Sequence, residues 1–303
     1  MRNSIAVSSQ HTEMNENIGK NSHLFKCSIS QKMVRNKMVI SGMIVISILS
    51  LVAIFSPLLA PYNPYKLSNL VDVKPSYEHL LGTDSLGRDV LSRLLYASRI
   101  SLMVGLGVML IGSFIGTTMG LLSGYLGGIV DMLIMRLADV FMTFSPMIIL
   151  LVVAGIVGPG FWEIILVLGV ISWPTLARIV RGNVLSIKEM NYVRAARLMG
   201  INTVGLIVRH ILPNVAAPIL VNATFKVSSA IISEAGLSFL GLGIQPPTAS
   251  WGNMLTESQS LSFLTTKLWQ WMPPGILIVV TVIAFNCIGE GFRSILNDDS
   301  AKN

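Results

Sequence analysis

The stretch KEMNYVRAARLMGINTVGLIVRHILP, residues 188–213, decides how the rest of the chain is organised. It lies between two long apolar segments, yet it carries charged and titratable side chains that would be costly at hydrocarbon depth. These side chains are Lys188, Glu189, Arg194, Arg197, Arg209 and His210. The stretch is therefore expected at a membrane surface, between two membrane spans.

Two short helices are predicted within this stretch. The first has one face at i, i+3, i+4 and i+7, made of Tyr192, Ala195, Ala196 and Met199. Gly200 can take the left-handed conformation that ends a helix, and Asn202 or Thr203 can cap the next one. The apolar face of the second helix consists of Val204, Ile207, Val208 and Ile211. Pro213 opens the following segment, where its missing N–H costs little.

The composition indicates an all-α integral membrane protein. Of 303 residues, 52% are hydrophobic and 12% are charged, whereas soluble domains average about 25% charged residues. The net charge of +7 indicates cytoplasmic loops and anionic lipid headgroups rather than nucleic acid. Cys27 and Cys287 lie near opposite ends of the chain, so neither a disulfide framework nor a zinc site is expected.

Six segments are long and apolar enough to span a membrane. The basic tail, residues 1–37, places the N-terminus in the cytoplasm, and an even number of spans returns the tail 294–303 to the same side. Residues 188–213, after the fourth span, then also lie in the cytoplasm. The six predicted spans are 38–60, 100–123, 133–157, 161–181, 213–235 and 273–292.

The extracytoplasmic loop, 61–99, is the part that agrees least with this topology, because it is rich in basic residues. Acidic residues lie nearby to pair with them, and the loop is expected to end in an amphipathic interfacial helix with Val90, Leu94 and Leu95 on one face. The bases are Lys66, Lys74, Arg88, Arg93 and Arg99, and the acids are Asp72, Glu78, Asp84 and Asp89.

Residues 100–293 are expected to form a five-helix core. In its first span a glycine recurs every fourth residue, which lets another helix approach closely; packing within the chain is favoured over a subunit interface. These glycines are Gly112, Gly116, Gly120 and Gly124. Arg136 and Asp139 are expected to pair with each other, and Pro146 and Pro174 to kink their spans.

The loop after the fifth span, residues 234–252, is too rich in Gly, Pro, Ser and Thr to form a plain spanning helix. It is expected to fold back against the outer mouth, where its backbone can be buried in protein. Trp251, Trp269 and Trp271 are expected to form an interfacial belt on this side.

The motifs of catalysis and energy conversion are missing from the sequence. It has no phosphate-binding G-x-x-x-x-G-K-[ST] loop, no H-E-x-x-H and no G-x-S-x-G. The histidines lie outside the predicted spans, so no catalytic or metal site is expected. The chain thus has a transport pathway without an energy source of its own, and it is not expected to be an enzyme.

Residues 188–213 resemble the EAA loop of ABC-transporter permease subunits. The matching residues are Ala195, Ala196, Gly200, Leu212 and Pro213. Two positions depart from the pattern: Arg194 stands where the motif has glutamate, and His210 where it has isoleucine. The resemblance implies that this loop, with Tyr192 and Met199, meets a partner ATPase.

Four further stretches resemble the C-type permease subunit of dipeptide, oligopeptide and nickel importers. They are HLLGTDSLGRDVLSRLLYASRISL (79–102), YLGGIVDMLIMRLADV (125–140), WPTLARIVRGNVLSI (173–187) and EAGLSFLGLGIQPPTASWGNML (234–255). The resemblance implies a type I ABC importer permease fold with six transmembrane helices, in the plasma membrane. It also implies a second permease subunit, two cytoplasmic ATPases that bind ATP and Mg²⁺, and an extracytoplasmic solute-binding protein. No cofactor is expected in this chain.

Peptide import is the leading hypothesis for this machine. Import of nickel or a metal chelate by the same machine is the alternative, although no His- or Cys-lined path favours it. A self-contained secondary carrier or channel is the alternative of another class. The substrate-binding residues stay unknown at this point.

Overall fold

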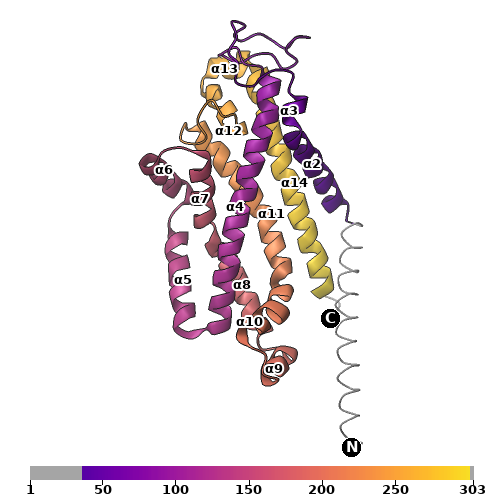
Figure 1. Ribbon diagram of the computed structural model, residues 1–303, viewed down its shortest axis with the longest axis vertical. Coiled ribbons are helices and arrows are strands. Elements are labelled where there is room, and N and C mark those ends of the chain that lie inside the picture. Colours follow the sequence, from indigo (N-terminus) through magenta and orange to yellow (C-terminus); the bar gives the residue numbers. More distant parts are fainter. Residues whose placement is uncertain (1–35, 301–303) are drawn as a thin grey trace, which may run out of the picture.

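The computed structural model describes residues 36–300, and within that range the chain is helical with connecting loops and contains no β-strand (Figure 1). Residues 1–35 and 301–303, and with them most of the expected N-terminal tail, lie outside the described residues. The helices are α2 (Lys37–Ile54), α3 (Ser56–Leu59), α4 (Val90–Leu126), α5 (Gly128–Thr143), α6 (Pro146–Val157), α7 (Phe161–Ile171), α8 (Trp173–Ile187), α9 (Asn191–Leu198), α10 (Thr203–Leu206), the π-helical turn η1 (Ile207–Ile211), α11 (Leu212–Phe239), α12 (Trp251–Met254), the 3₁₀ turn η2 (Thr256–Gln259), α13 (Leu261–Thr266) and α14 (Leu268–Ser300).

Five helical stretches of the described chain are long and apolar enough to cross a membrane, and a sixth arises if one bent pair counts as a span. That pair is α5 and α6, which meet at 83°. The predicted span 133–157 is therefore broken in two, and the kink expected at Pro146 is confirmed as a sharp bend. Phe144 and Ser145 are extended and Pro146 restarts the helix, because proline lacks the N–H that a continuous helix needs.

The outer loop is shorter than predicted, because α4 already begins at Val90. The Asp89 carboxylate caps it by accepting a hydrogen bond from the backbone N–H of Ser92 at 2.8 Å. Val90 and Leu94 are buried in the protein. They belong to the first two turns of a 37-residue helix, so the expected interfacial amphipathic helix is wrong.

Two other helices are longer than predicted. α10, η1 and α11 form one continuous helix over Thr203–Phe239, so the second short helix of the sequence prediction is the first part of the fifth span. α14 continues to Ser300, which makes residues 294–300 helical rather than a separate tail. Pro174 lies in the first turn of α8, next to the break from α7 at Ser172, as expected.

The glycine stripe of α4 packs against α8, which confirms packing within the chain. A Cβ added to Gly120 would lie 2.6 Å from the Ala177 carbonyl oxygen and 2.6 Å from Val180 Cβ. Gly112, Gly116 and Gly124 likewise face residues of the α7–α8 segment. Backbones that approach this closely gain dispersion contacts along the whole stripe.

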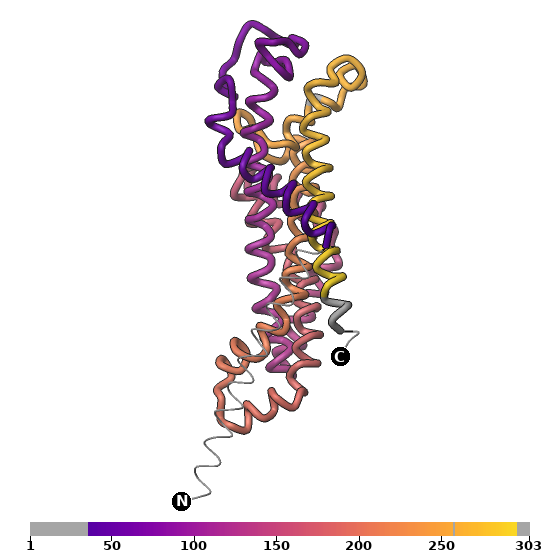
Figure 2. The backbone as a smooth tube through the Cα atoms, turned by 90° about the vertical axis from the view of Figure 1, so that its right-hand side faces the viewer, coloured from indigo at the N-terminus to yellow at the C-terminus, as the bar shows by residue number. Residues whose placement is uncertain are grey.

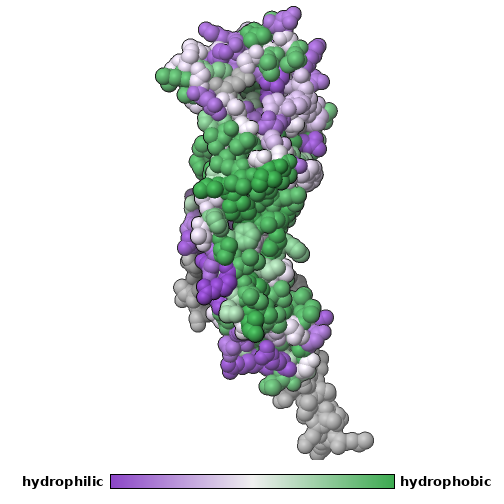
Figure 3. Space-filling model, turned by 90° about the vertical axis from the view of Figure 1, so that its left-hand side faces the viewer, coloured by the Kyte–Doolittle hydropathy of each residue, from purple (hydrophilic) through white to green (hydrophobic). Residues whose placement is uncertain are grey.

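The molecule is a tall bundle with polar ends and an apolar middle (Figure 3). α2 lies alongside α14 at one edge of the bundle, as the ribbon and the backbone tube both show (Figures 1 and 2). Residues 60–89, α12 and α13 gather at one end, and α9 and α10 protrude at the other (Figure 1). The two polar ends therefore correspond to the two faces of a membrane.

The loop 60–89 is held together by its acidic residues. Asp84 accepts hydrogen bonds from the backbone N–H of Arg88 at 2.8 Å and from its Nε at 2.7 Å, and Arg93 Nε lies 3.5 Å away. Asp89 also contacts His79 Nδ1 at 2.8 Å. The expected neutralisation of Arg88 and Arg93 by Asp84 is confirmed, and the basic loop contains internal ion pairs.

The loop after α11 folds back onto the bundle, as predicted, but Trp251 does not join an interfacial belt. Trp251 is fully buried. Its backbone N–H donates to Ser101 Oγ at 3.1 Å and its indole N–H to Ser98 Oγ at 3.2 Å. Both serines belong to α4, so this tryptophan fastens the folded-back loop to the bundle core.

Asp72 joins the outer loop to the start of α14 and predicts a small pH effect. Burial raises the pKa of Asp72, but hydrogen bonds from Lys267 and Gln270 outweigh burial and hold the pKa below its ordinary value of 3.8. The stabilisation is present above that value and is lost as the pH falls through the depressed pKa. We expect acidification from about pH 6 to about pH 3 to destabilise wild type by about 1 kcal/mol more than it destabilises Asp72→Asn. Thermal unfolding of both proteins at the two pH values measures this difference. Equal acid sensitivity of both proteins would contradict this.

Candidate functional site

Helix α9 divides the predicted face into a buried and an exposed part. Ala196 is buried together with Val193, and both belong to one apolar cluster with residues of α8, α10 and α11. Tyr192, Ala195 and Met199 are exposed. These three residues, hereafter the docking face, lie at the end of the molecule where α9 protrudes (Figure 2).

The turn after α9 follows the sequence prediction. Gly200 has φ +80°, the left-handed region in which glycine is unstrained. Its N–H bonds to the Arg197 carbonyl oxygen at 3.1 Å. The Asn202 side chain then caps α10 by accepting from the Gly205 N–H at 2.8 Å, so Asn202, rather than Thr203, is the cap.

The predicted apolar face of the next helix is only partly correct. Val204 and Val208 are exposed, whereas Leu206 and Ile211 are fully buried. The π-helical turn η1 begins after Leu206 and ends at Ile211, and its i→i+5 spacing brings these two residues, five apart, to the same face. Leu212 and Pro213 are the first two residues of α11, directly after η1.

Ion pairs and hydrogen bonds tie the basic residues of this end to the bundle. Arg194 donates to Glu189 at 2.5 Å, and this bond holds the pKa of Glu189 below its ordinary value. Arg197 donates to Tyr125 Oη at 3.2 Å, and Lys188 donates to the Gly124 carbonyl oxygen at 3.0 Å. Gly124 and Tyr125 both lie in the last turn of α4, so two hydrogen bonds attach the segment after α8 to this spanning helix.

The acids of α5 pair with α8 rather than within their own helix. Asp131 contacts Arg181 Nε at 2.5 Å, and Asp139 contacts Arg178. Arg136 is exposed. The expected Arg136–Asp139 pair is therefore wrong, because α8 brings a better placed guanidinium to each acid.

A cavity of about 370 Å³ lies between α4, α5, α7, α8 and α11. Four polar residues of α11 line it at i, i+4, i+7 and i+11, which is one helical face. They are Asn222, Lys226, Ser229 and Ser233. Lys226 was visible in the sequence as a charge within a span, but the three neutral residues are noticed only once the cavity is known.

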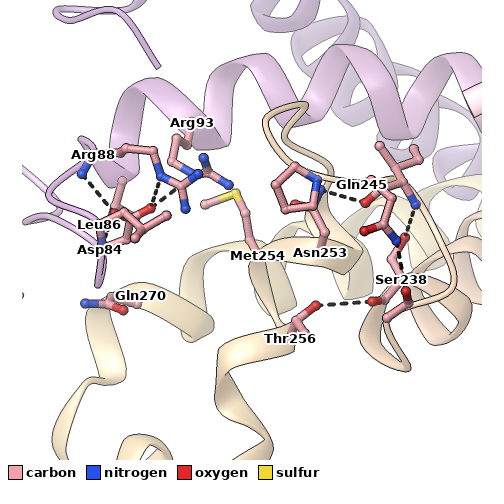
Figure 4. A pocket seen from close by; sticks show the side chains of 14 residues that line it. Asp84, Leu86, Arg88, Arg93, Ser238, Gln245, Asn253, Met254, Thr256 and Gln270 are labelled. Atoms are coloured by element: carbon pink, nitrogen blue, oxygen red, sulfur yellow. Dashed lines mark hydrogen bonds and ion pairs between the residues drawn. The ribbon is translucent and has the colours of Figure 1, made fainter. Parts of the chain in front are cut away.

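A second hollow, of about 290 Å³, lies at the end of the bundle opposite α9, between the loop 60–89, the residues after α11 and α14 (Figure 4). Asp84, Arg88 and Arg93 line one side, and Ser238 and Thr256 the other (Figure 4). Its polar groups largely bind one another, as with Thr256 Oγ1 and the Ser238 carbonyl oxygen at 3.1 Å. This hollow joins the folded-back loop to the outer loop.

Comparison with known families settles the class of protein. Residues 116–301 match the model described as the binding-protein-dependent transport system inner membrane component. The chain belongs to this permease family. Residues 29–79 of the permease also match the N-terminal TM domain of oligopeptide transport permease C. The first match includes α9, its docking face and every residue that lines the cavity beside α11 except Val108.

Relatives align with nearly the whole permease. A permease protein of Brucella suis biovar 1 (strain 1330) is 39% identical over 90% of this chain and 91% of its own length. The dipeptide transport system permease protein DppC of Alkalihalophilus pseudofirmus is 38% identical over 87% of this chain and 86% of its own. Among solved structures, the inward-facing MetNI methionine ABC transporter gives a TM-score of 0.49 at 19% identity, covering 64% of this chain and 94% of that one.

Proposed function

We propose that this permease is one of two different permease subunits of an ATP-driven importer and that it carries di- and oligopeptides across the plasma membrane. Relatives named for peptide transport support the substrate class. The missing phosphate-binding loop supports separate ATPase subunits as the sites of ATP and Mg²⁺. A solute-binding protein delivers the peptide on the side of the loop 60–89, and both chain ends lie in the cytoplasm.

The observation that carries this proposal is the split of α9 into a buried and an exposed face. Val193 and Ala196 belong to an apolar cluster that includes Leu121 of α4, Val180 of α8 and Val215 of α11. The docking face stays open at the same time. A partner ATPase that binds this face and moves α9 would thereby shift three spanning helices, because packed apolar clusters move as units.

Reconstitution tests the proposed function. The permease is placed in liposomes with its second permease, its ATPases and its binding protein, and uptake of a labelled tripeptide is measured. We expect uptake with ATP and none without it, and none from the permease alone. Uptake by the permease alone in ATP-free liposomes would favour a carrier or channel. Accumulation of nickel without peptide would favour the metal importer.

A further inference from the structure

Lys226 occupies an unusual position for a cation, because it lies in the middle of a spanning helix and is mostly buried. Its ammonium donates to the Ser172 carbonyl oxygen at 2.9 Å. Ser172 is the residue at the break between α7 and α8. Gly112 of α4 leaves room for this contact, because a Cβ there would lie 2.9 Å from Lys226 Nζ. The ammonium of Lys226 on α11 thus lies at the cavity wall, bonded to the break between α7 and α8 and packed against Gly112 of α4.

The ammonium retains donors for a ligand. A lysine has three N–H donors, and the bond to Ser172 uses one of them. Among the described residues, Lys226 makes no ion pair with a carboxylate. A charge at this depth without a counter-ion marks a substrate or ion pathway in membrane proteins.

Asn222 supplies the complementary group one turn earlier on the same face. The oxygen of its amide is buried and has no hydrogen-bond partner among the described residues. A buried acceptor without a partner costs free energy. An N–H donor from a bound molecule would remove this cost. Ser229 and Ser233 extend the polar face, and Ser229 is exposed at the surface of the single chain.

Together, an ammonium and an amide oxygen one turn apart match the last residue of a peptide. That residue presents a carboxylate and, a few ångströms away, a backbone amide N–H. We propose that the cavity beside Asn222, Lys226, Ser229 and Ser233 binds the C-terminal residue of a peptide in transit, with its carboxylate on Lys226 and its amide N–H on Asn222. The cavity volume of about 370 Å³ is at the lower end of the range for small-ligand sites. This inference rests on the proposed peptide substrate.

The test compares two tripeptides that differ at one end only, a free acid and its C-terminal amide. Uptake by the complete transporter is measured with each peptide at a concentration that saturates the binding protein. The ratio of acid uptake to amide uptake is compared between wild type and Lys226→Met. We expect that ratio to fall about tenfold, since charge-assisted hydrogen bonds to a carboxylate are lost. Lys74→Met, an exposed loop residue, is the matched control and should keep the wild-type ratio.

A second variant covers the case in which Lys226→Met does not assemble. Asn222→Asp places a negative charge beside the bound carboxylate, so the acid-to-amide ratio should fall here too. Equal ratios in wild type and in the assembled variants would mean that Lys226 only holds the break between α7 and α8, and the inference would be lost. If wild type imported neither peptide, the proposed function would fail and the inference with it.

Discussion

Replacing Ala195 by arginine is expected to abolish ATP-driven uptake while the permease stays folded in the membrane. Ala195 is the small residue at the centre of the docking face, and a long cation there would prevent close approach of a partner helix. The few hot-spot residues near the centre of an interface each contribute about 2 kcal/mol or more, and we expect Ala195 to lie in such a centre. We therefore expect uptake to fall about 100-fold, which corresponds to about 2.7 kcal/mol.

The control for this variant is Ser186→Arg. Ser186 is also exposed and lies at the same end of the molecule, but outside residues 188–213. Co-purification of the ATPases with each variant separates a docking defect from a transport defect. Loss of ATPase association in Ala195→Arg alone supports the docking face. Normal association and uptake in Ala195→Arg would show that the ATPase binds elsewhere.

Gly120→Val is expected to destabilise the fold itself. The new Cβ would lie 2.6 Å from the Ala177 carbonyl oxygen and 2.6 Å from Val180 Cβ. The clash cannot be relieved by a side-chain rotation, because the carbonyl oxygen belongs to the backbone of α8. Overpacking of a close-packed interface costs about 3 kcal/mol at its upper range. For a chain of 303 residues that corresponds to a fall in Tm of about 5 °C, which can be measured as the monodisperse fraction that survives heating in detergent.

Gly182→Val provides a matched control in α8. A Cβ added at Gly182 meets nothing within 4 Å, so the same substitution should leave Tm within about 2 °C of wild type. The two variants share the loss of a helical glycine and the gain of a β-branched side chain. If Gly120→Val were as stable as Gly182→Val, the close packing of α4 on α8 would not contribute as described.

Local signals in the sequence predicted much of this architecture. The glycine stripe of α4 packs as expected, since only glycine permits such a close approach. Gly200 ends α9 and Asn202 caps the next helix, because these effects depend on one or two residues and their own backbone. The cap at Asp89 is equally local but was not predicted, and its position before Val90 could have indicated the early start of α4.

Features that depend on distant parts of the chain escaped prediction. Pro146 indicated a kink, but the composition of an apolar run does not give its angle, so the size of the 83° bend between α5 and α6 was not predicted. The π-helical turn η1 has no sequence signature, so the burial of Leu206 together with Ile211, five residues later, was not predicted. The partner of Asp139 lies 39 residues away on α8, beyond the reach of a helical spacing rule.

The continuity of α10, η1 and α11 has a mechanical consequence. The helix Thr203–Phe239 has 37 residues and is about 55 Å long at 1.5 Å per residue, whereas about 20 residues suffice to cross the hydrocarbon layer. One of its ends adjoins α9 and the other adjoins the loop fastened by Trp251. If this helix tilted as a unit by about 5°, its far end would move by about 5 Å over this length. A displacement of α9 on one side of the membrane would then be transmitted to the other side by a single helix.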